Sequence, residues 1–158
     1  MRPRLVVFGW GNESRGDDGL GPALLRRVEA AAAPGVTAIE DFQLQIEHAL
    51  DLEGADLVLF IDAGKDTPAP FAFTQITPRE GLSHTSHALA PDQVLAVYRQ
   101  VKGVEPPPAF QLCVRGERFE LGEGLSEAAR ARLEAASAFV ARLLERRDAA
   151  SWRALPQG

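Results

Sequence analysis

Cysteine, concentrated positive charge and long apolar runs are all scarce in this sequence. Its single cysteine, Cys113, cannot form an internal disulfide bond and is typical of a protein from a reducing compartment. The N-terminal apolar run "LVVF" is too short for the apolar part of a signal peptide, and no segment reaches membrane length. We therefore expect a cytoplasmic protein that does not insert into a membrane.

The charges are mixed along the chain. The 158 residues include 17 basic and 22 acidic side chains, which give a net charge of −5 without a basic stripe. Binding to nucleic acid needs concentrated Lys and Arg, so nucleic acid is not the expected main partner. A chain of this length with 46% hydrophobic residues can bury one core. We expect a single domain over residues 1–147 and a frayed tail over residues 148–158.

Strands and helices alternate in the predicted secondary structure. Strands are predicted within residues 4–10, 34–42, 55–64, 71–77 and 106–116, and helices within residues 19–33, 45–54, 91–103 and 125–147. The unbroken apolar run "LVLFI" indicates a strand that is covered on both faces, as in a parallel sheet between helices. "FAFTQIT" alternates instead and is typical of an edge strand, which we expect to be antiparallel. The pattern predicts an α/β/α sandwich.

Two helices have clear apolar faces. In the last helix Ser126 is the expected N-cap, and the apolar stripe consists of Leu133, Ala136, Val140 and Leu143. In the helix over residues 91–103, the side chains spaced for burial are Val94, Leu95, Tyr98 and Val101.

The loop "GWGNESRGDDGLGP" joins the first strand to the first helix and contains glycines without a lysine. The dinucleotide-binding pattern G-x-G-x-x-G fails because Ser14 occupies its third glycine position. Gly11 and Gly16 have the Walker spacing, but Asp17 and Asp18 then replace the lysine and the hydroxyl residue. Two carboxylates would repel the phosphates, so no nucleotide cofactor is expected, and a titration with ATP or NAD should be flat.

Carboxylates favour the start of a helix, and one aspartate of the pair is sufficient as an N-cap. The second aspartate of the pair is then not needed as a cap and is a candidate for another role. Sites in open α/β sheets gather at the carboxyl ends of strands, where Asp18 and Asp62 both follow predicted strands. The loop "SHTSH" adds His84 and His87. Two carboxylates and an imidazole would suit nickel or zinc.

The same loop resembles a known signature. "GWGNESRGDDGLGP" is similar to the pattern G-x-G-N-x-x-x-x-D-D-G-x-G of the nickel–iron hydrogenase maturation endopeptidases. The likeness continues in the strand "LVLFIDA", in "SHTSHALAPDQVLAVY" and in the closing helix. It implies a five-stranded, mostly parallel sheet in an α/β/α sandwich.

The resemblance also implies an activity. These enzymes remove a short C-terminal extension from the hydrogenase large-subunit precursor after nickel insertion, without a classical protease nucleophile. Carried over by position, Asp18, Asp62 and His87 would contact nickel that the substrate already holds, whereas His84 falls outside the pattern. The segment "EDFQLQIEHALDL" lacks the glycine turn common in the family, and Gln43 and Gln45 occupy that rim. Which hydrogenase is processed is left open.

Other chemistries are less well supported. The sequence has no G-x-S-x-G elbow and no H-E-x-x-H motif, so His48 is expected to be a solvated helix residue. Cys113 is expected in the core, and Trp10 and Phe42 fit either the core or a partner-binding rim. The alternative function is a non-catalytic nickel chaperone or sensor on a Rossmann-like scaffold. Such a module would bind metal but leave the precursor intact.

Overall fold

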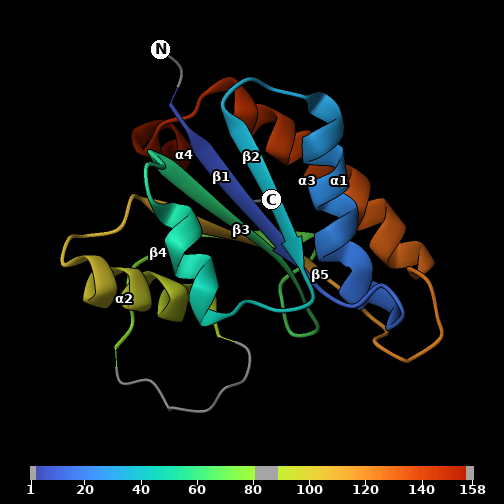
Figure 1. Ribbon diagram of the computed structural model, residues 1–158. Helices are drawn as coiled ribbons and strands as arrows, with labels where there is room; N and C mark the ends of the chain where they lie inside the picture. The colour runs from blue at the N-terminus through green and yellow to red at the C-terminus, as the bar shows by residue number, and fades with distance from the viewer. Residues whose placement is uncertain (1–2, 81–88, 156–158) are drawn as a thin grey trace.

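Five strands form one twisted sheet in this computed structural model, which describes residues 3–80 and 89–155 (Figure 1). The strand order is β2-β1-β3-β5-β4. The parallel strands are β2 (Val36–Asp41), β1 (Leu5–Trp10), β3 (Leu57–Gly64) and β5 (Ala109–Arg115). The edge strand β4 (Phe71–Ile76) pairs antiparallel with β5. The predicted sheet, including its antiparallel edge, is confirmed.

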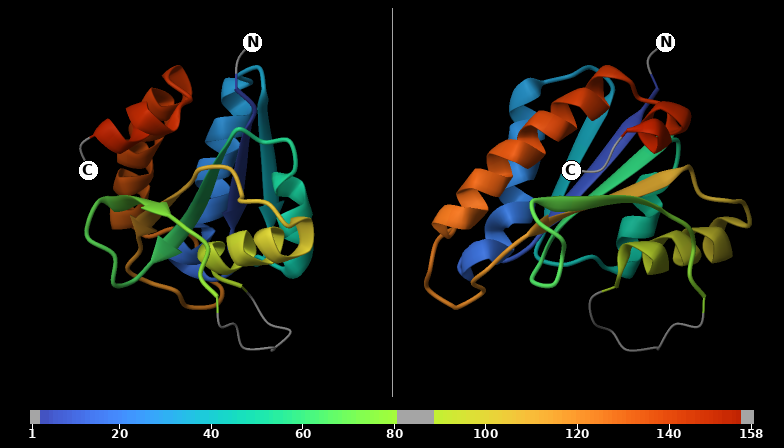
Figure 2. Two further views of the ribbon diagram at one scale, coloured as in Figure 1. Left: turned by 90° about the vertical axis from the view of Figure 1, so that its left-hand side faces the viewer. Right: turned by 180° about the vertical axis from the view of Figure 1, so that it is seen from behind.

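Helices cover both faces of the sheet, which confirms the three-layer sandwich (Figure 2). One face packs against α1 (Leu20–Ala31), α3 (Glu127–Glu145) and α4 (Ala149–Ala154). The other face packs against the 3-10 helix η2 (Ile46–Leu52) and α2 (Pro91–Lys102). A short 3-10 turn, η1 (Gly16–Gly19), precedes α1.

The central strand β3 explains the continuous apolar run in the sequence. Leu59 and Ile61 lie in the core beneath α1 and α3, whereas Val58 and Phe60 lie in the core beneath η2 and α2. All four side chains are at most 1% exposed. Because alternate residues of a strand face opposite sides, a strand covered on both faces must be apolar at every position.

The predicted helix faces are largely correct. The Ser126 hydroxyl accepts a hydrogen bond from the Ala129 N–H at 3.1 Å and so caps α3, and the predicted α3 stripe is buried. In α2 the prediction for Val101 is wrong, because its side chain is 62% exposed. Val101 lies in the last turn of α2, which ends at Lys102, beyond the part of the helix that packs on the sheet.

The expectation of a frayed tail does not hold for its first part. Ala149–Ala154 form α4, which is capped by the Asp148 side chain, and Trp152 is buried at 1% exposure. The Trp152 indole N–H donates to the Leu143 carbonyl at 3.1 Å, and its ring packs edge-on against Phe110. The segment folds because a large aromatic side chain fills the space between α3 and the sheet.

The chain leaves β1 and β3 in opposite directions along the sheet. From β1 it passes through α1 to β2, whereas from β3 it passes to β4, α2 and β5. The carboxyl ends of β1 and β3 therefore border a topological switch point, where ligands commonly bind in open α/β sheets.

Across residues 3–80 and 89–155, no helix is both long and apolar enough to cross a membrane.

Candidate active site

The glycines of the β1–α1 loop allow the loop to fold tightly against its surroundings. Gly11 has a φ of +146° and Gly16 a φ of +57°, values that L side chains rarely adopt. A Cβ on Gly11 would overlap the Asp18 carbonyl oxygen, and a Cβ on Gly16 would overlap the Arg118 carbonyl oxygen. These glycines therefore serve close backbone packing, which explains a glycine-rich loop without a phosphate-binding lysine.

Asp17 is a buried structural carboxylate. It accepts hydrogen bonds from the Glu117 and Arg118 N–H groups at 2.7 and 3.1 Å. It also accepts hydrogen bonds from the N–H and hydroxyl of Ser126 at 2.7 and 2.8 Å. Burial raises the pKa of this carboxyl, but the four hydrogen bonds outweigh burial and leave the pKa below its usual value.

The prediction that one aspartate of the pair acts as an N-cap is wrong. Neither η1 nor α1 has a side-chain cap, and their N-cap residues are Arg15 and Gly19. Asp17 instead joins the start of α1 to residues 117–126, which lead from β5 into α3. Further backbone bonds connect the same segments, from the Asp17 N–H to the Arg118 carbonyl and from the Gly16 N–H to the Glu123 carbonyl.

Asp18 has a different environment from its neighbour. Its side chain is half-buried, and its Oδ2 accepts a hydrogen bond from the Asn12 N–H at 2.6 Å. No side-chain cation pairs with it in the salt bridges of the described residues. Asp18 is thus held by the loop backbone at the carboxyl end of β1, with its charge not neutralised by an ion pair.

Asp62 lies near the carboxyl end of β3, the next strand in the sheet. Its Oδ1 accepts a hydrogen bond from the Ala63 N–H at 2.7 Å. Burial raises the pKa of Asp62 to about 7, the Ala63 hydrogen bond opposes that rise, and the nearby Asp18 charge adds to it. The two predicted carboxylates are therefore brought together at the switch point, close enough for one charge to affect the other.

The two histidines of the predicted site, His84 and His87, lie outside the described residues. The remainder of the chain, residues 3–80 and 89–155, contains no group of three His, Cys, Asp or Glu side chains that could hold a metal ion. Within that part, the site consists of the pair Asp18 and Asp62. Carboxylate oxygens are suitable ligands for a borderline cation, and a pair leaves most coordination positions for other ligands.

His48 is not solvated as predicted, because its side chain is only 5% exposed. Its Nδ1 accepts a hydrogen bond from the Gln45 N–H at 2.8 Å, its Nε2 lies 3.3 Å from an Asp41 carboxylate oxygen, and its ring packs edge-on against Phe8. His48 thereby links the end of β2 to the start of η2. The missed signal was its position three residues after Gln45, where it completes a capping box.

Cys113 is half-buried rather than in the core. It is paired with Asp62 in the register of β3 and β5, and its Sγ lies 3.0 Å from the Thr67 hydroxyl. Burial raises the pKa of this thiol, the Thr67 hydrogen bond lowers it, and the charge of Asp62 raises it further. A thiol that holds its proton more tightly than usual is a poor nucleophile, so Cys113 is not suited to attack a peptide bond.

Two pockets adjoin helix α1. A pocket of about 520 Å³ adjoins Asp18 and is lined by residues 11–14, Arg26, Glu40, Asp41 and Phe42. Phe42 is 71% exposed, which assigns it to this rim rather than to the core. Arg26 forms ion pairs with Glu13 and, at 3.2 Å, with Glu40.

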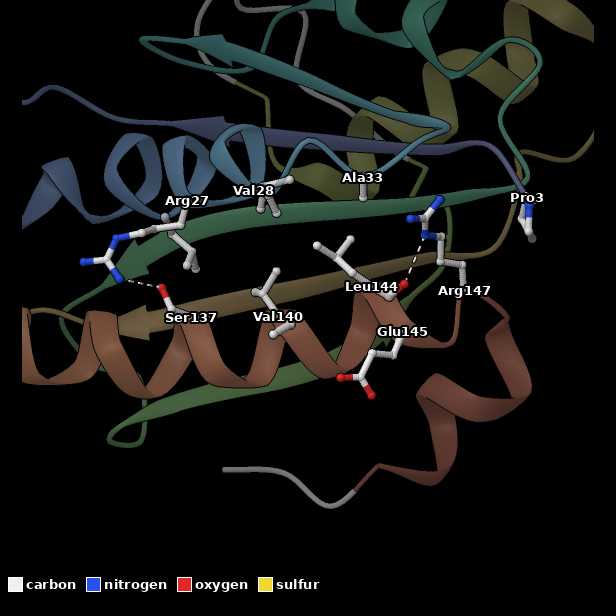
Figure 3. A pocket seen from close by; sticks show the side chains of 12 residues that line it. Pro3, Arg27, Val28, Ala33, Ser137, Val140, Leu144, Glu145 and Arg147 are labelled. Carbon is white, nitrogen blue, oxygen red and sulfur yellow. Dashed lines mark hydrogen bonds between the residues drawn. The ribbon is translucent and has the colours of Figure 1, made fainter. Parts of the chain in front are cut away.

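The second pocket, of about 620 Å³, lies between α1 and α3 near Pro3, at the amino end of β1 (Figure 3). Arg27 at its wall bonds to Ser137 and Glu134, and Arg147 donates to the Pro34 carbonyl. Its lining residues include neither Asp18 nor Asp62, so this pocket is not part of the candidate site.

Several solved structures similar to this chain are hydrogenase maturation proteases. The [NiFe] hydrogenase maturation protease HycI from Thermococcus kodakarensis is 24% identical, with a TM-score of 0.65 over 90% of this chain and 93% of that chain. The maturating endopeptidase HybD from E. coli is 22% identical, with a TM-score of 0.67 over the same shares. The endopeptidase HycI from Escherichia coli is 16% identical, with a TM-score of 0.66 over 89% of this chain and 90% of that chain.

Sequence comparisons add no closer relative. No protein-family model matches the chain, and no curated protein matches it. The structural likeness nevertheless extends over about nine-tenths of the chain. This protein has the α/β fold of the hydrogenase maturation proteases.

Proposed function

We propose that this protein is an endopeptidase that removes the C-terminal extension of a nickel–iron hydrogenase large-subunit precursor after nickel insertion. The observation that carries the proposal is the pairing of Asp18 with Asp62 at the switch point of this fold. These are the two carboxylates that the loop signature and the strand "LVLFIDA" single out. The fold of the named maturation proteases is the supporting context.

In this proposal nickel belongs to the substrate. Asp18, Asp62 and His87 contact the nickel that the precursor already holds, so that only a loaded precursor completes the site. Asp18 carries an unpaired charge at the edge of the loop, and Asp62 accepts only one hydrogen bond from the described residues. Both therefore have oxygen lone pairs to offer a cation.

In this proposal no side chain acts as the nucleophile. Cys113 is a protonated thiol, and Ser14 is an exposed loop serine without a basic partner in the described hydrogen bonds. The proposed nucleophile is water: it adds to the scissile carbonyl carbon, the C–N bond breaks, and the amine leaves with a proton from that water. The substrate's nickel can polarise the carbonyl or activate the water.

Asp62 suits the proton transfers of such a reaction. A carboxyl with a pKa of about 7 is present in both protonation states near neutral pH, which favours general acid and base roles. Whether Asp62 transfers a proton or only contacts nickel would be visible in the pH profile of cleavage.

The proposal is tested with purified protein and a hydrogenase large-subunit precursor, prepared with and without nickel. Mass spectrometry should show loss of the extension from the nickel-loaded precursor only. If the loaded precursor stays intact while the protein binds nickel, the non-catalytic chaperone or sensor is the correct function. Equal cleavage of both forms would reject recognition of the substrate's nickel.

A further inference from the structure

Strand β2 has an open outer edge. It is the first strand in the sheet order and pairs only with β1 in the part of the chain that the structure describes. The carbonyls of Gly35 and Asp41 accept hydrogen bonds from the N–H groups of Leu5, in β1, and Gly11, just after β1. Because backbone groups alternate in direction along a strand, the N–H and C=O groups of Ala38 and Glu40 point away from β1.

The features that usually protect an edge strand are weak here. Edge strands are commonly blocked by Lys, Pro, a bulge or a covering element. Val36–Ile39 is a run of Val, Thr, Ala and Ile, and its pairing with β1 is regular, without a bulge. Every β2 residue is half-buried or exposed, whereas five of the six residues of β1 are buried. Figure 2 shows β2 at the outer side of the sheet.

This open edge leads directly to the candidate site. Glu40 and Asp41 at the end of β2 line the pocket of about 520 Å³, together with Phe42 and the loop at residues 11–14. Within that loop the Asn12 N–H donates to Asp18. A chain lying along β2 would therefore pass over the pocket toward Asp18, with Phe42 exposed beside its path.

The end of this edge is held in a fixed position. Asp41 lies within 3.3 Å of the buried His48 ring, and its other carboxylate oxygen accepts the Phe42 N–H at 2.7 Å. These contacts fix the direction in which β2 ends and the placement of Phe42. An edge that is already ordered binds an extended peptide without the entropic cost of ordering itself.

We propose that the outer edge of β2 binds the precursor's C-terminal extension as an added strand, which directs the scissile segment across the pocket to Asp18. This inference rests on the proposed function. The backbone groups of Ala38 and Glu40 supply hydrogen bonds that do not depend on the sequence of the extension, as in other cases of β-strand addition. Side chains at the pocket rim, Phe42 among them, then contact alternate residues of the added strand.

The direct test is amide hydrogen exchange resolved by residue in the Asp62→Asn variant, with and without the nickel-loaded precursor. Asp62→Asn is used so that the precursor is not cleaved during the measurement, at precursor concentrations that saturate the variant. The Ala38 and Glu40 amides should exchange about tenfold or more slowly in the complex, because they enter new strand hydrogen bonds. The Thr37 and Ile39 amides, which face β1, should change little.

Two variants give an independent measurement. Ala38→Pro removes an N–H that β1 does not use. It should raise KM for the precursor about tenfold with little change in kcat, because the added strand loses roughly one hydrogen bond and its close fit beside residue 38. Ala38→Ser retains the N–H and should behave like wild type. Circular dichroism checks that both variants fold.

The outcomes separate this inference from the function on which it rests. If wild type cleaves the precursor but the β2 amides show no alternating protection, the strand-addition inference is wrong and the proposed function remains. If the β2 amides are already protected in a concentrated sample without precursor, the edge pairs with a second copy, which also rejects the inference. If wild type does not cleave the precursor at all, both proposals fail.

Discussion

The Asp17 carboxylate accepts hydrogen bonds from both the N–H and the hydroxyl of Ser126, at 2.7 and 2.8 Å. Ser126 is also the N-cap of α3, where its hydroxyl oxygen accepts the Ala129 N–H. One buried carboxylate thus connects the loop before α1 to the start of α3, although 109 positions separate the two residues. The charge of the neighbouring Asp18 is not used in this way, because its side chain accepts a hydrogen bond only within its own loop, from the Asn12 N–H.

This difference predicts opposite effects of two alanine substitutions. Asp17→Ala leaves three partly buried N–H groups and a hydroxyl without their acceptor, so the free energy of unfolding should fall by about 3 kcal/mol. That is more than the roughly 1 kcal/mol typical of a lost helix cap. Asp18→Ala removes one hydrogen bond and should leave the melting temperature near that of wild type.

Denaturant unfolding and precursor processing should be measured on both variants. Asp18→Ala should abolish processing while remaining folded, and Asp17→Ala should retain part of the activity at temperatures where it is folded. An unstable Asp18→Ala protein alongside a stable, inactive Asp17→Ala protein would mean that the two roles are reversed.

The raised pKa of Asp62 predicts how stability depends on pH in the metal-free protein. Between the ordinary value of 3.8 and the folded value of about 7, the folded state holds a proton that the unfolded state lacks. The free energy of unfolding contributed by this group therefore falls as the pH rises through that window. Above pH 7 the folded protein contains a poorly solvated carboxylate.

Asp62→Asn removes that charge and retains the shape of the side chain. The variant should be more stable than wild type at pH 8 by on the order of 2 kcal/mol. This is less than the free energy equivalent to the whole pKa shift of Asp62, because the carboxyl is partly exposed to solvent. At pH 4 the difference should nearly vanish. Urea unfolding with a chelator present measures both values. The same difference at both pH values would contradict the environment described for Asp62.

The C-terminal helix α4 is predicted to contribute to the core. Trp152→Ala should lower the free energy of unfolding by about 3–5 kcal/mol, because it removes a buried indole that packs against Phe73 and Phe110. Arg153→Ala is a matched control in the same helix, where an exposed side chain bonds to Gln75. Chemical denaturation compares the two. Equal, small effects would mean that α4 does not complete the core.

The isolated protein should bind metal only weakly. The proposed contacts are carboxylates and an imidazole without a thiolate, so bound nickel or zinc should exchange readily and be absent after treatment with a chelator. Metal analysis of the purified protein checks this. Stoichiometric zinc that resists the chelator would instead indicate a conventional metalloprotease.

The sequence predicted those features that depend on local patterns. Continuous hydrophobicity identified β3, alternation identified β4 as an edge strand, and the position of Ser126 identified the cap of α3. Proximity of Asp18 to Asp62 followed from the rule that strand ends gather at one edge of a parallel sheet.

Features that depend on distant segments could not be predicted in the same way. The role of Asp17 requires residues 117–126 to fold back over the loop, and nothing near Asp17 in the sequence indicates this. The burial of His48 depends on Phe8 from another strand. The helix around Trp152 did have a local signal, since Asp148 precedes Ser151 by the spacing of an N-cap, but its burial depends on Phe110.

The central claim is that Asp18, Asp62 and His87 act together on the nickel held by the precursor, and processing rates of the nickel-loaded precursor test it most directly. Asp62→Asn and His87→Gln should each nearly eliminate cleavage, and the double variant should be scarcely slower than either, as happens when residues act as a unit. His84→Gln, outside the signature, should retain most activity, with circular dichroism confirming that every variant folds. Normal cleavage by His87→Gln, or loss of cleavage in His84→Gln alone, would contradict the account.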